Sequence, residues 1–339
     1  MIVGMTYDLR DDYLAEGFSF EQAAEFDRRE TIDGIRETLE DLGYETDPIG
    51  HVRRLTGRIA AGDSWDLVFN IAEGVKGFAR EAQVPALLEA HGIPYTFSDP
   101  MVLALTLHKG MTKRVIRDTG LATPDFRIVE DLEEVRSVDL SYPLFAKPVA
   151  EGTGKGINGA SKITNPNELA SVCEMLLRSH DQPVLVESFL PGREFTVGIL
   201  GNGKGAVAVG AIEVILKAQA EPEVYSFWNK EKFKELVEYR LVDDVEAFRA
   251  KELALQAYRC LGCRDAARVD LRSDALGNPH FIEVNPLAGL QPEHSDLPIL
   301  CGMAGMSYRE LIGAIMDSAL TRLGIFPYLK RSVAGGVKN

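Results

Sequence analysis

The segment RVDLRSDALGNPHFIEVNP, residues 268–286, restricts the possible folds more than any other part of the chain. Apolar residues alternate with polar ones on both sides of residues 276–277, a Leu-Gly pair suited to a tight turn. This pattern predicts two antiparallel strands joined as a β-hairpin. The chain is therefore expected to contain an antiparallel sheet with polar side chains on one face.

Four polar side chains of this hairpin are expected to share that face. A symmetric turn places Asp270 opposite Glu283 and Arg268 opposite Asn285. Two opposed carboxylates repel each other unless a cation lies between them. Oxygen ligands with an amide beside them fit Mg²⁺, or Mn²⁺, bridging nucleotide phosphates, so Asp270, Glu283 and Asn285 are candidate metal ligands. The alternative is a solvated charged face, although such strands rarely place an Asn-Pro break after the acids.

A lysine followed by a glycine-rich loop forms a second candidate site. Lys147 ends a strand-like run, and the loop EGTGKG occupies residues 151–156. Backbone N–H groups in such a loop can surround a phosphate, and lysine supplies a point charge. No Ser or Thr follows the Gly-Lys pair, so this is not a Walker loop, and a plain turn is the alternative.

The first hundred residues alternate between apolar runs and amphipathic segments. Strands are expected at 2–6, 66–70 and 93–96, and helices at 25–42 and 81–91. This order predicts a parallel, Rossmann-like lobe. No GxGxxG follows the first strand, so the lobe by itself indicates no nucleotide and disfavours a dinucleotide oxidoreductase.

The rest of the chain predicts two lobes of mixed helix and strand. We expect a Rossmann-like lobe over 1–105, a small α+β lobe over 106–188, a strand-rich lobe over 189–330 and a tail over 331–339. The small lobe begins with a basic helix and contains three strands. The last lobe contains four alternating strands and a polar stretch, residues 217–243.

The charge and the termini limit the partners and the location. The formal net charge of −14 repels phosphate backbones, and no dense Lys/Arg cluster offsets it, so nucleic acid is excluded as a partner. The N-terminus lacks the basic flank and apolar core of a signal peptide, and no apolar run reaches the roughly 18 residues of a membrane span. We therefore expect a cytoplasmic protein without a membrane segment.

The four cysteines are expected to be free, structural thiols. Only Cys260 and Cys263 have the two-residue spacing of a metal or redox pair, and no second pair completes a zinc site. The sequence around them predicts a helix that ends at Gly262 and leads into a strand.

The order of the motifs LHKGMTK, FAKP, EGTGKG, LVESFLPGREFTV, RVD and EVNPLAG resembles the D-alanine–D-alanine ligase family of the ATP-grasp superfamily. The resemblance covers residues 65–312. It implies an N-terminal Rossmann-like lobe followed by two lobes that hold ATP between them. It also implies a homodimer, a place in peptidoglycan biosynthesis, and ligation of amino-acid or peptide substrates through an acyl phosphate.

Roles for individual residues follow from the resemblance alone. Lys109 and Lys147 match phosphate-binding lysines, and Lys230 matches the lysine of a mobile loop over the γ-phosphate. Arg268 and the backbone of Gly289 match groups that stabilise the oxyanion. The lid over the phosphates matches Glu151, Gly152, Thr153 and Gly154, and Thr153 stands where the family has a serine that contacts the substrate. The hinge against adenine matches Glu187, Ser188, Phe189 and Leu190, and the carboxylate that holds the ribose matches Glu194. The metal ligands match Asp270, Glu283 and Asn285, and the residue that holds the second substrate's carboxylate matches Ser295.

Three departures from the family concern the amino acids rather than ATP. The acidic residue that holds the first ammonium has no clear counterpart, with Asp8, Asp11 and Asp12 as candidates. Glu73 stands where the family has histidine, and Glu231 stands where it has an aromatic residue. The alternatives are therefore a ligase for other amino acids or a small peptide, or a nucleotide-binding regulatory protein that has lost turnover.

Overall fold

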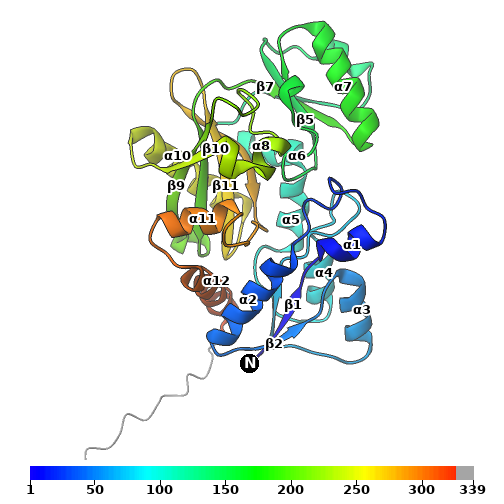
Figure 1. Cartoon of the computed structure of the whole chain (residues 1–339), viewed down its shortest axis with the longest axis vertical. Coiled ribbons are helices and arrows are strands. Elements are labelled where there is room, and N and C mark those ends of the chain that lie inside the picture. The colour runs from blue at the N-terminus through cyan, green and yellow to red at the C-terminus, as the bar shows by residue number, and fades with distance from the viewer. Residues whose placement is uncertain (326–339) are drawn as a thin grey trace, which may run out of the picture.

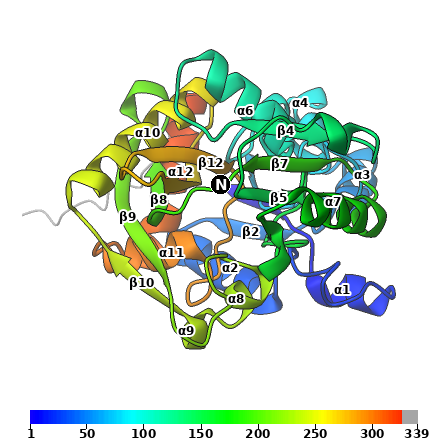
Figure 2. The same cartoon turned by 90° about the horizontal axis from the view of Figure 1, so that it is seen from above.

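The computed structural model describes residues 1–325, which form three sheets with their covering helices (Figure 1). The N-terminal sheet, at the lower right of Figure 1, is parallel, and the other two are antiparallel. Seen from above, the second and third sheets lie on opposite sides of the molecule (Figure 2). The predicted combination of a Rossmann-like lobe with two further lobes of helix and strand is confirmed, whereas the boundaries near residues 105 and 188 stay predictions. The tail 331–339 lies outside the described residues.

The N-terminal sheet has the strand order β2-β1-β3. Its strands are β1 (Ile2–Thr6), β2 (Glu45–Pro48) and β3 (Leu67–Asn70), and its helices are α1 (Arg10–Ala15), α2 (Arg29–Asp41), α3 (Val52–Ala60) and α4 (Gln83–Ala90). The strand expected at 93–96 is reduced to one bridge between Tyr95 and Val68. The expected helix over 25–42 begins only at Arg29, because the preceding residues form turns and an isolated bridge between Leu9 and Asp27, and residues 24–28 line the site.

The second sheet has the strand order β4-β7-β5-β6 and carries the phosphate-loop candidate. Its strands are β4 (Phe126–Val129), β5 (Leu144–Pro148), β6 (Lys162–Ile163) and β7 (Val184–Ser188), and the helices of this region are α5 (Pro100–Leu107), α6 (Lys109–Asp118) and α7 (Pro166–His180). Lys147 therefore lies at the end of β5, directly before the loop 151–156.

The third sheet has the strand order β10-β9-β8-β11-β12. Its strands are β8 (Glu194–Leu200), β9 (Val207–Leu216), β10 (Val237–Leu241), β11 (Ala266–Ser273) and β12 (Pro279–Asn285). Its helices are α8 (Phe227–Glu231), α9 (Phe233–Leu236), α10 (Val245–Leu261), α11 (Asp296–Met303) and α12 (Tyr308–Leu323). The predicted hairpin register is confirmed, since Arg268 pairs with Asn285 and Asp270 pairs with Glu283, with a register shift directly after Asp270.

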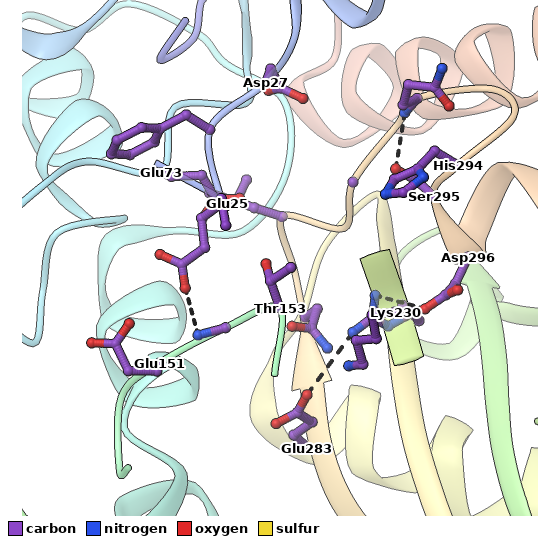
Figure 3. Close-up of a pocket in the computed structure, with 18 of the residues that line it drawn as sticks. Glu25, Asp27, Glu73, Glu151, Thr153, Lys230, Glu283, His294, Ser295 and Asp296 are labelled. Atoms are coloured by element: carbon purple, nitrogen blue, oxygen red, sulfur yellow. Dashed lines mark hydrogen bonds and ion pairs between the residues drawn. The ribbon is translucent and has the colours of Figure 1, made fainter. Parts of the chain in front are cut away.

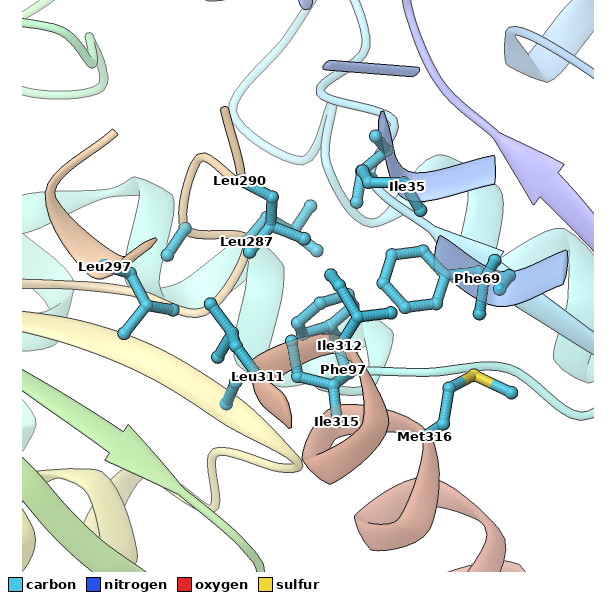
Figure 4. Close-up of a cluster of buried hydrophobic side chains, with 14 of the residues drawn as sticks. Ile35, Phe69, Phe97, Leu287, Leu290, Leu297, Leu311, Ile312, Ile315 and Met316 are labelled. Carbon is cyan, nitrogen blue, oxygen red and sulfur yellow. The ribbon is translucent and has the colours of Figure 1, made fainter. Parts of the chain in front are cut away.

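One hydrophobic core joins the first and third sheets. Ile35 of α2 and Phe69 of β3 pack in the same cluster as Ile312 and Met316 of α12 (Figure 4). Leu287, from the loop after β12, belongs to this cluster as well. Burying a large aliphatic side chain contributes about 1.5–3 kcal/mol, so this core holds the loop after β12 against the N-terminal sheet.

The cysteines are free and helix α10 ends where the sequence predicts. Cys173, Cys260, Cys263 and Cys301 are all free thiols, and α10 ends before Gly262, which has a φ of 76°. In residues 1–325, no single helix has the length and hydropathy to cross a membrane. Only α11 and α12 taken together meet that criterion, by length and composition, and they are bent by 110° at their junction.

Candidate active site

A cavity lies where the three sheets converge, between the N-terminal segment, the loop 151–156 and the ends of β11 and β12 (Figure 3). In Figure 3, Thr153 lies between Glu25 on one side and Glu283 with Lys230 on the other. The predicted site residues that line it are Glu73, Lys109, Glu151, Gly152, Thr153, Lys230, Arg268, Glu283, Asn285, Gly289 and Ser295. Those outside its lining are Lys147, Gly154, Glu187, Ser188, Phe189, Leu190, Glu194 and Asp270.

Arg268 is fixed between two carboxylates at the centre of the site. Its Nη2 lies 2.9 Å from Oδ2 of Asp270, and its Nη1 lies 3.2 Å from Oδ2 of Asp296, at the start of α11. The Asp296 carboxylate also accepts a hydrogen bond from the hydroxyl of Tyr239 at 2.7 Å. Burial disfavours the guanidinium charge, but Asp270 and Asp296 outweigh it and raise the pKa of Arg268. A fully charged, oriented guanidinium therefore faces the cavity.

The acids of the hairpin have opposite titration behaviour. Burial pushes the pKa of Glu283 up, but Lys109, Lys147 and other cations outweigh it and lower that pKa below the ordinary value. Burial raises the pKa of Asp270, and the pull of Arg268 offsets this only in part. Nζ of Lys109 lies 3.4 Å from Oε2 of Glu283.

The donor set fits a divalent cation that also takes ligands from phosphate. Asp270 and Glu283 are cross-strand partners on the same face, and Asn285, two residues after Glu283 on β12, lines the cavity as Glu283 does. The Oδ1 atom of this amide is the one that could act as a ligand, whereas Nδ2 is a hydrogen-bond donor and is buried without a partner among residues 1–325. In that part of the chain, no group of three or more His, Cys, Asp or Glu side chains could hold a metal ion. A hard cation here would therefore also need the amide oxygen of Asn285 and oxygen atoms from a bound phosphate or from water.

The glycine-rich loop is held against the N-terminal segment by one buried glutamate. Oε1 of Glu25 accepts a hydrogen bond from the N–H of Gly152 at 2.5 Å. The same carboxylate lies 3.1 Å from Nζ of Lys155 and 3.2 Å from Nη2 of Arg80. Thr153 has a φ of 54°, a left-handed conformation that costs free energy for a β-branched residue. These contacts hold the loop against the N-terminal segment, and Glu151, Gly152 and Thr153 of the loop line the cavity.

The same loop contacts the polar segment that carries Lys230. Gly154 has a φ of 77°, and a Cβ at this position would lie 2.9 Å from the backbone nitrogen of Phe227. The N–H of Phe227 donates to the carbonyl of Ile157 at 3.4 Å. Lys230 itself lies with Nζ 4.8 Å from the ring centroid of Tyr225. The loop and the Lys230 segment therefore close the cavity together.

Glu187 joins two buried lysines behind the cavity. Its two carboxylate oxygens lie 2.8 Å from Nζ of Lys113 and 2.8 Å from Nζ of Lys147. Burial lowers the pKa of Lys113 to about 8, whereas the attraction of Glu187 outweighs burial and raises the pKa of Lys147. This ion cluster fixes the position of Lys147 beside the phosphate-loop candidate.

The remaining residues of the predicted adenine and ribose region lie along β7 and the start of β8. Glu194 lies 3.3 Å from Nη1 of Arg272. The ring of Phe189 has Lys162 on one side, 4.6 Å from its centroid, and Arg272 at 5.0 Å. Ser188 pairs with Leu144 in the second sheet, and Leu190 is buried.

Gly289 and Ser295 lie together at the end of the cavity next to α11. The hydroxyl of Ser295 accepts a hydrogen bond from the N–H of Gln291 at 3.1 Å, and a Cβ on Gly289 would lie 2.7 Å from that hydroxyl. Glu73 lines the opposite, N-terminal wall. Burial, followed by the nearby Glu81, raises its pKa well above the ordinary value.

The N-terminal acids named as candidates for the first ammonium do not line this cavity. Asp8 is buried and accepts hydrogen bonds from the hydroxyl of Tyr13 and from the N–H of Gly74. Asp12 lines a separate cavity, and Asp11 lines neither of the two. The acids that take their place on the N-terminal wall are Glu25, Asp27 and Glu81.

Sequence reasoning missed several charged residues of the site. Glu25, Arg80 and Lys155 form one ion cluster, but they lie far apart in the sequence, and no motif connects them. Asp296 follows the predicted Ser295 directly, and an acid at the start of a helix is a common N-terminal signal. That signal predicts the helix but not the contact with Arg268.

The comparisons with known proteins agree with this arrangement. Residues 115–317 match the family described as D-ala D-ala ligase C-terminus. The chain is 33% identical over 295 residues to the D-alanine–D-alanine ligase of Bordetella petrii, covering 86% of each chain. It is also 33% identical over 261 residues to the uncharacterized protein y4sG of Sinorhizobium fredii, covering 76% of this chain and 75% of that protein.

A solved structure shows the same fold. The D-alanine–D-alanine ligase of Bacillus anthracis in complex with ATP superimposes with a TM-score of 0.72 at 23% identity, covering 95% of this chain and 98% of the other. The sequence match and the shared architecture lead to the same assignment: this chain belongs to the D-alanine–D-alanine ligase family of ATP-grasp enzymes.

Proposed function

We propose that the protein is an ATP-dependent ligase that activates the carboxylate of one amino acid as an acyl phosphate and joins it to the amine of a second. D-alanine is the first candidate for both substrates. The observation that carries the proposal is the placement of Arg268, Asp270, Glu283 and Asn285 on one sheet face, where all but Asp270 line the same cavity as the glycine-rich loop. Water or amines attack carboxylates poorly, so a site that brings phosphate and carboxylate together supplies the missing activation.

The chain's own cations support the placement of ATP phosphates between the two lobes. Lys109, Lys147 and Lys230 would neutralise the phosphate charge. N–H groups of the loop 151–156 would donate to phosphate oxygens, except those of Gly152 and Lys155, which already donate to Glu25 and to the carbonyl of Gly152. Asp270, Glu283 and Asn285 would hold Mg²⁺ or Mn²⁺, which withdraws charge from the transferred phosphoryl group. The predicted hinge residues 187–190 and Glu194 would receive the adenosine.

The amino acids would meet at the opposite end of the cavity. Arg268 and the N–H of Gly289 would stabilise the negative oxygen that forms when the amine attacks, and one such donor is typically worth about 3–4 kcal/mol. Ser295 would hold the carboxylate of the second substrate, and Thr153 would contact the substrates from the loop. The closed contact between that loop and the Lys230 segment would exclude water from the acyl phosphate.

Formation of ADP with a panel of D- and L-amino acids, combined with mass spectrometry of the product, tests the proposal. We expect ADP and a dipeptide in equal amounts. ATP binding without any ADP formation across the panel would contradict it and favour a regulatory protein.

A second candidate function is ligation of amino acids other than D-alanine, or extension of a small peptide. It is favoured by the acidic side chains of Glu73, Glu81 and Asp27 on the N-terminal wall and by Glu231, which also lines the cavity. Turnover with other panel members but not with D-alanine would establish it. A homodimer formed through the N-terminal lobe, a cytoplasmic location and a role in peptidoglycan biosynthesis stay predictions.

A further inference from the structure

A buried arginine at the N-terminal end of the cavity lacks an acidic partner. Arg10 begins α1, is 8% exposed and lines the cavity. Its Nε donates to the carbonyl of Phe26 at 3.1 Å, and its Nη2 donates to the carbonyl of Ala24. Its Nη1 is buried without a hydrogen-bond partner among residues 1–325, and no carboxylate oxygen of those residues lies within 4.0 Å of the guanidinium.

An unpaired buried cation is unusual because no opposite charge offsets the free energy that its loss of hydration costs. Charged side chains are almost never fully buried unless they are paired. The two carbonyl groups satisfy two of the donors of Arg10 but carry no net charge. The ring of Phe20 lies 5.5 Å from the guanidinium carbon, which covers the group further. Arg10 therefore lacks an anionic partner among residues 1–325, and it lines the cavity from which an anion would approach.

The other charges around Arg10 do not supply this anion. Glu231 lies 4.0 Å from Arg28, so its charge is shared with a second arginine. Burial raises the pKa of Asp27 to about 7, so this acid is partly neutral at physiological pH. Burial, followed by Arg28, lowers the pKa of His294, which keeps the imidazole neutral. None of these groups gives Arg10 an ion pair of its own.

The position of this group indicates which substrate it contacts. Arg28 and Arg10 are both close enough to His294 to affect its titration, and His294 directly precedes Ser295. The proposed function places the carboxylate of the amine-bearing substrate at Ser295. Groups on that substrate that extend past Ser295 would therefore approach Arg10 and Arg28, on the side of the cavity away from Glu283.

On the basis of the proposed ligase function, we propose that Arg10 and Arg28 bind a carboxylate of the amine-bearing substrate that lies further from the attacking amine than the α-carboxylate of alanine. The side chain of an acidic amino acid and the C-terminus of a short peptide both carry such a group. A carboxylate here would accept from Nη1 of Arg10 and complete the charge balance of the pocket.

A panel of second substrates tests this preference and separates the two sources. D- and L-aspartate and D- and L-glutamate are compared with the corresponding asparagine and glutamine. Alanyl-alanine dipeptides of D- and L-configuration are compared with their C-terminal amides. We expect kcat/KM to be about tenfold or more higher for the acid than for its amide in one of these sets, as a charge-assisted hydrogen bond predicts. Tandem mass spectrometry should find the acid in the C-terminal, amine-derived part of the product.

Three results have distinct meanings in this experiment. Equal use of acids and amides overturns the proposal, and so does a product with the acidic residue only in the N-terminal position. If no second substrate of any kind is joined, the proposed ligase function fails instead.

The charge of Arg28 can be removed without disturbing the fold, because its side chain is 48% exposed. Arg28→Met should lower the acid-over-amide preference about tenfold, through KM rather than kcat. Arg29→Met is the matched control, since Arg29 is the next residue and lines the separate cavity with Asp12. An unchanged preference in Arg28→Met, or an equal loss in Arg29→Met, overturns the proposal. Arg10→Gln is less informative alone because Arg10 also holds two backbone carbonyls.

Discussion

Replacing Glu187 by glutamine should destabilise the fold, because the change removes the charge shared by two buried lysines. The side chains of Lys113, Lys147 and Glu187 are 0%, 4% and 4% exposed, and both Nζ···Oε distances are 2.8 Å. Removing one partner of a buried ion pair typically costs about 3–5 kcal/mol, since the remaining charge is left without compensation.

The structure places the expected cost near the lower end of that range. Lys113 keeps hydrogen bonds to the hydroxyl of Thr123 at 2.9 Å and to the carbonyl of Phe281 at 3.3 Å, and its pKa of about 8 lets it lose its proton readily. Lys147 has no second hydrogen-bond acceptor among residues 1–325, so most of the loss in free energy of unfolding comes from leaving its buried charge unpaired. For a chain of 339 residues, a loss of about 3 kcal/mol corresponds to a decrease in Tm of roughly 4 °C.

Differential scanning calorimetry of Glu187→Gln without nucleotide measures this effect. Glu174→Gln is the matched control, because its pair with Arg178 is 2.7 Å long but lies on the surface, where such pairs contribute about 0.5 kcal/mol or less. The pKa of Glu187 is lowered in the fold, so its contribution is present above the ordinary value of 4.5 and is lost as the pH falls further. A Tm for Glu187→Gln within about 2 °C of the wild type at pH 7 would refute the reasoning.

Three further predictions follow from the site. Burial raises the pKa of Asp27 from 3.8 to about 7, so between these pH values the folded chain keeps a proton that the unfolded chain releases. The free energy of unfolding therefore falls as the pH rises from 3.8 to 7. Asp27→Asn removes this penalty and should raise Tm more at pH 8 than at pH 5 in thermal melts. Gly154→Ala places a Cβ 2.9 Å from the backbone of Phe227 and should lower kcat/KM for ATP about tenfold, whereas Gly159→Ala, which meets nothing within 4 Å, should not. Arg268→Met should lower kcat about 100- to 1000-fold while calorimetric titration still detects ATP binding, and normal turnover would disprove its role.

The β-hairpin of the site could be predicted from sequence because its register depends on local pattern and one turn. Asp270 and Glu283 are opposite each other as the alternation required, although the register shifts directly after Asp270. Strand β2 could not be found in this way, because ETDP has neither alternation nor apolar residues. It is a strand because Ile2 and Val3 of β1 pair with Glu45 and Thr46.

The contacts between lobes are beyond what local pattern can predict. Glu25 and Gly152 are 127 residues apart and meet only because the loop after β5 packs on the N-terminal segment. The partners of Arg268 depend in the same way on where α11 begins relative to β11. Such contacts follow from the packing of whole lobes, so sequence predicts the types of residue in the site better than their pairing.

The central claim is that a carboxylate is activated by phosphorylation in this cavity, and isotope transfer tests it most directly. The amino acid that supports the fastest ADP formation is labelled with ¹⁸O in its carboxylate, and the released phosphate is examined by ³¹P NMR. An acyl phosphate intermediate predicts one ¹⁸O atom in each phosphate for each peptide bond formed. Unlabelled phosphate alongside the dipeptide, or release of AMP with pyrophosphate, would contradict the account.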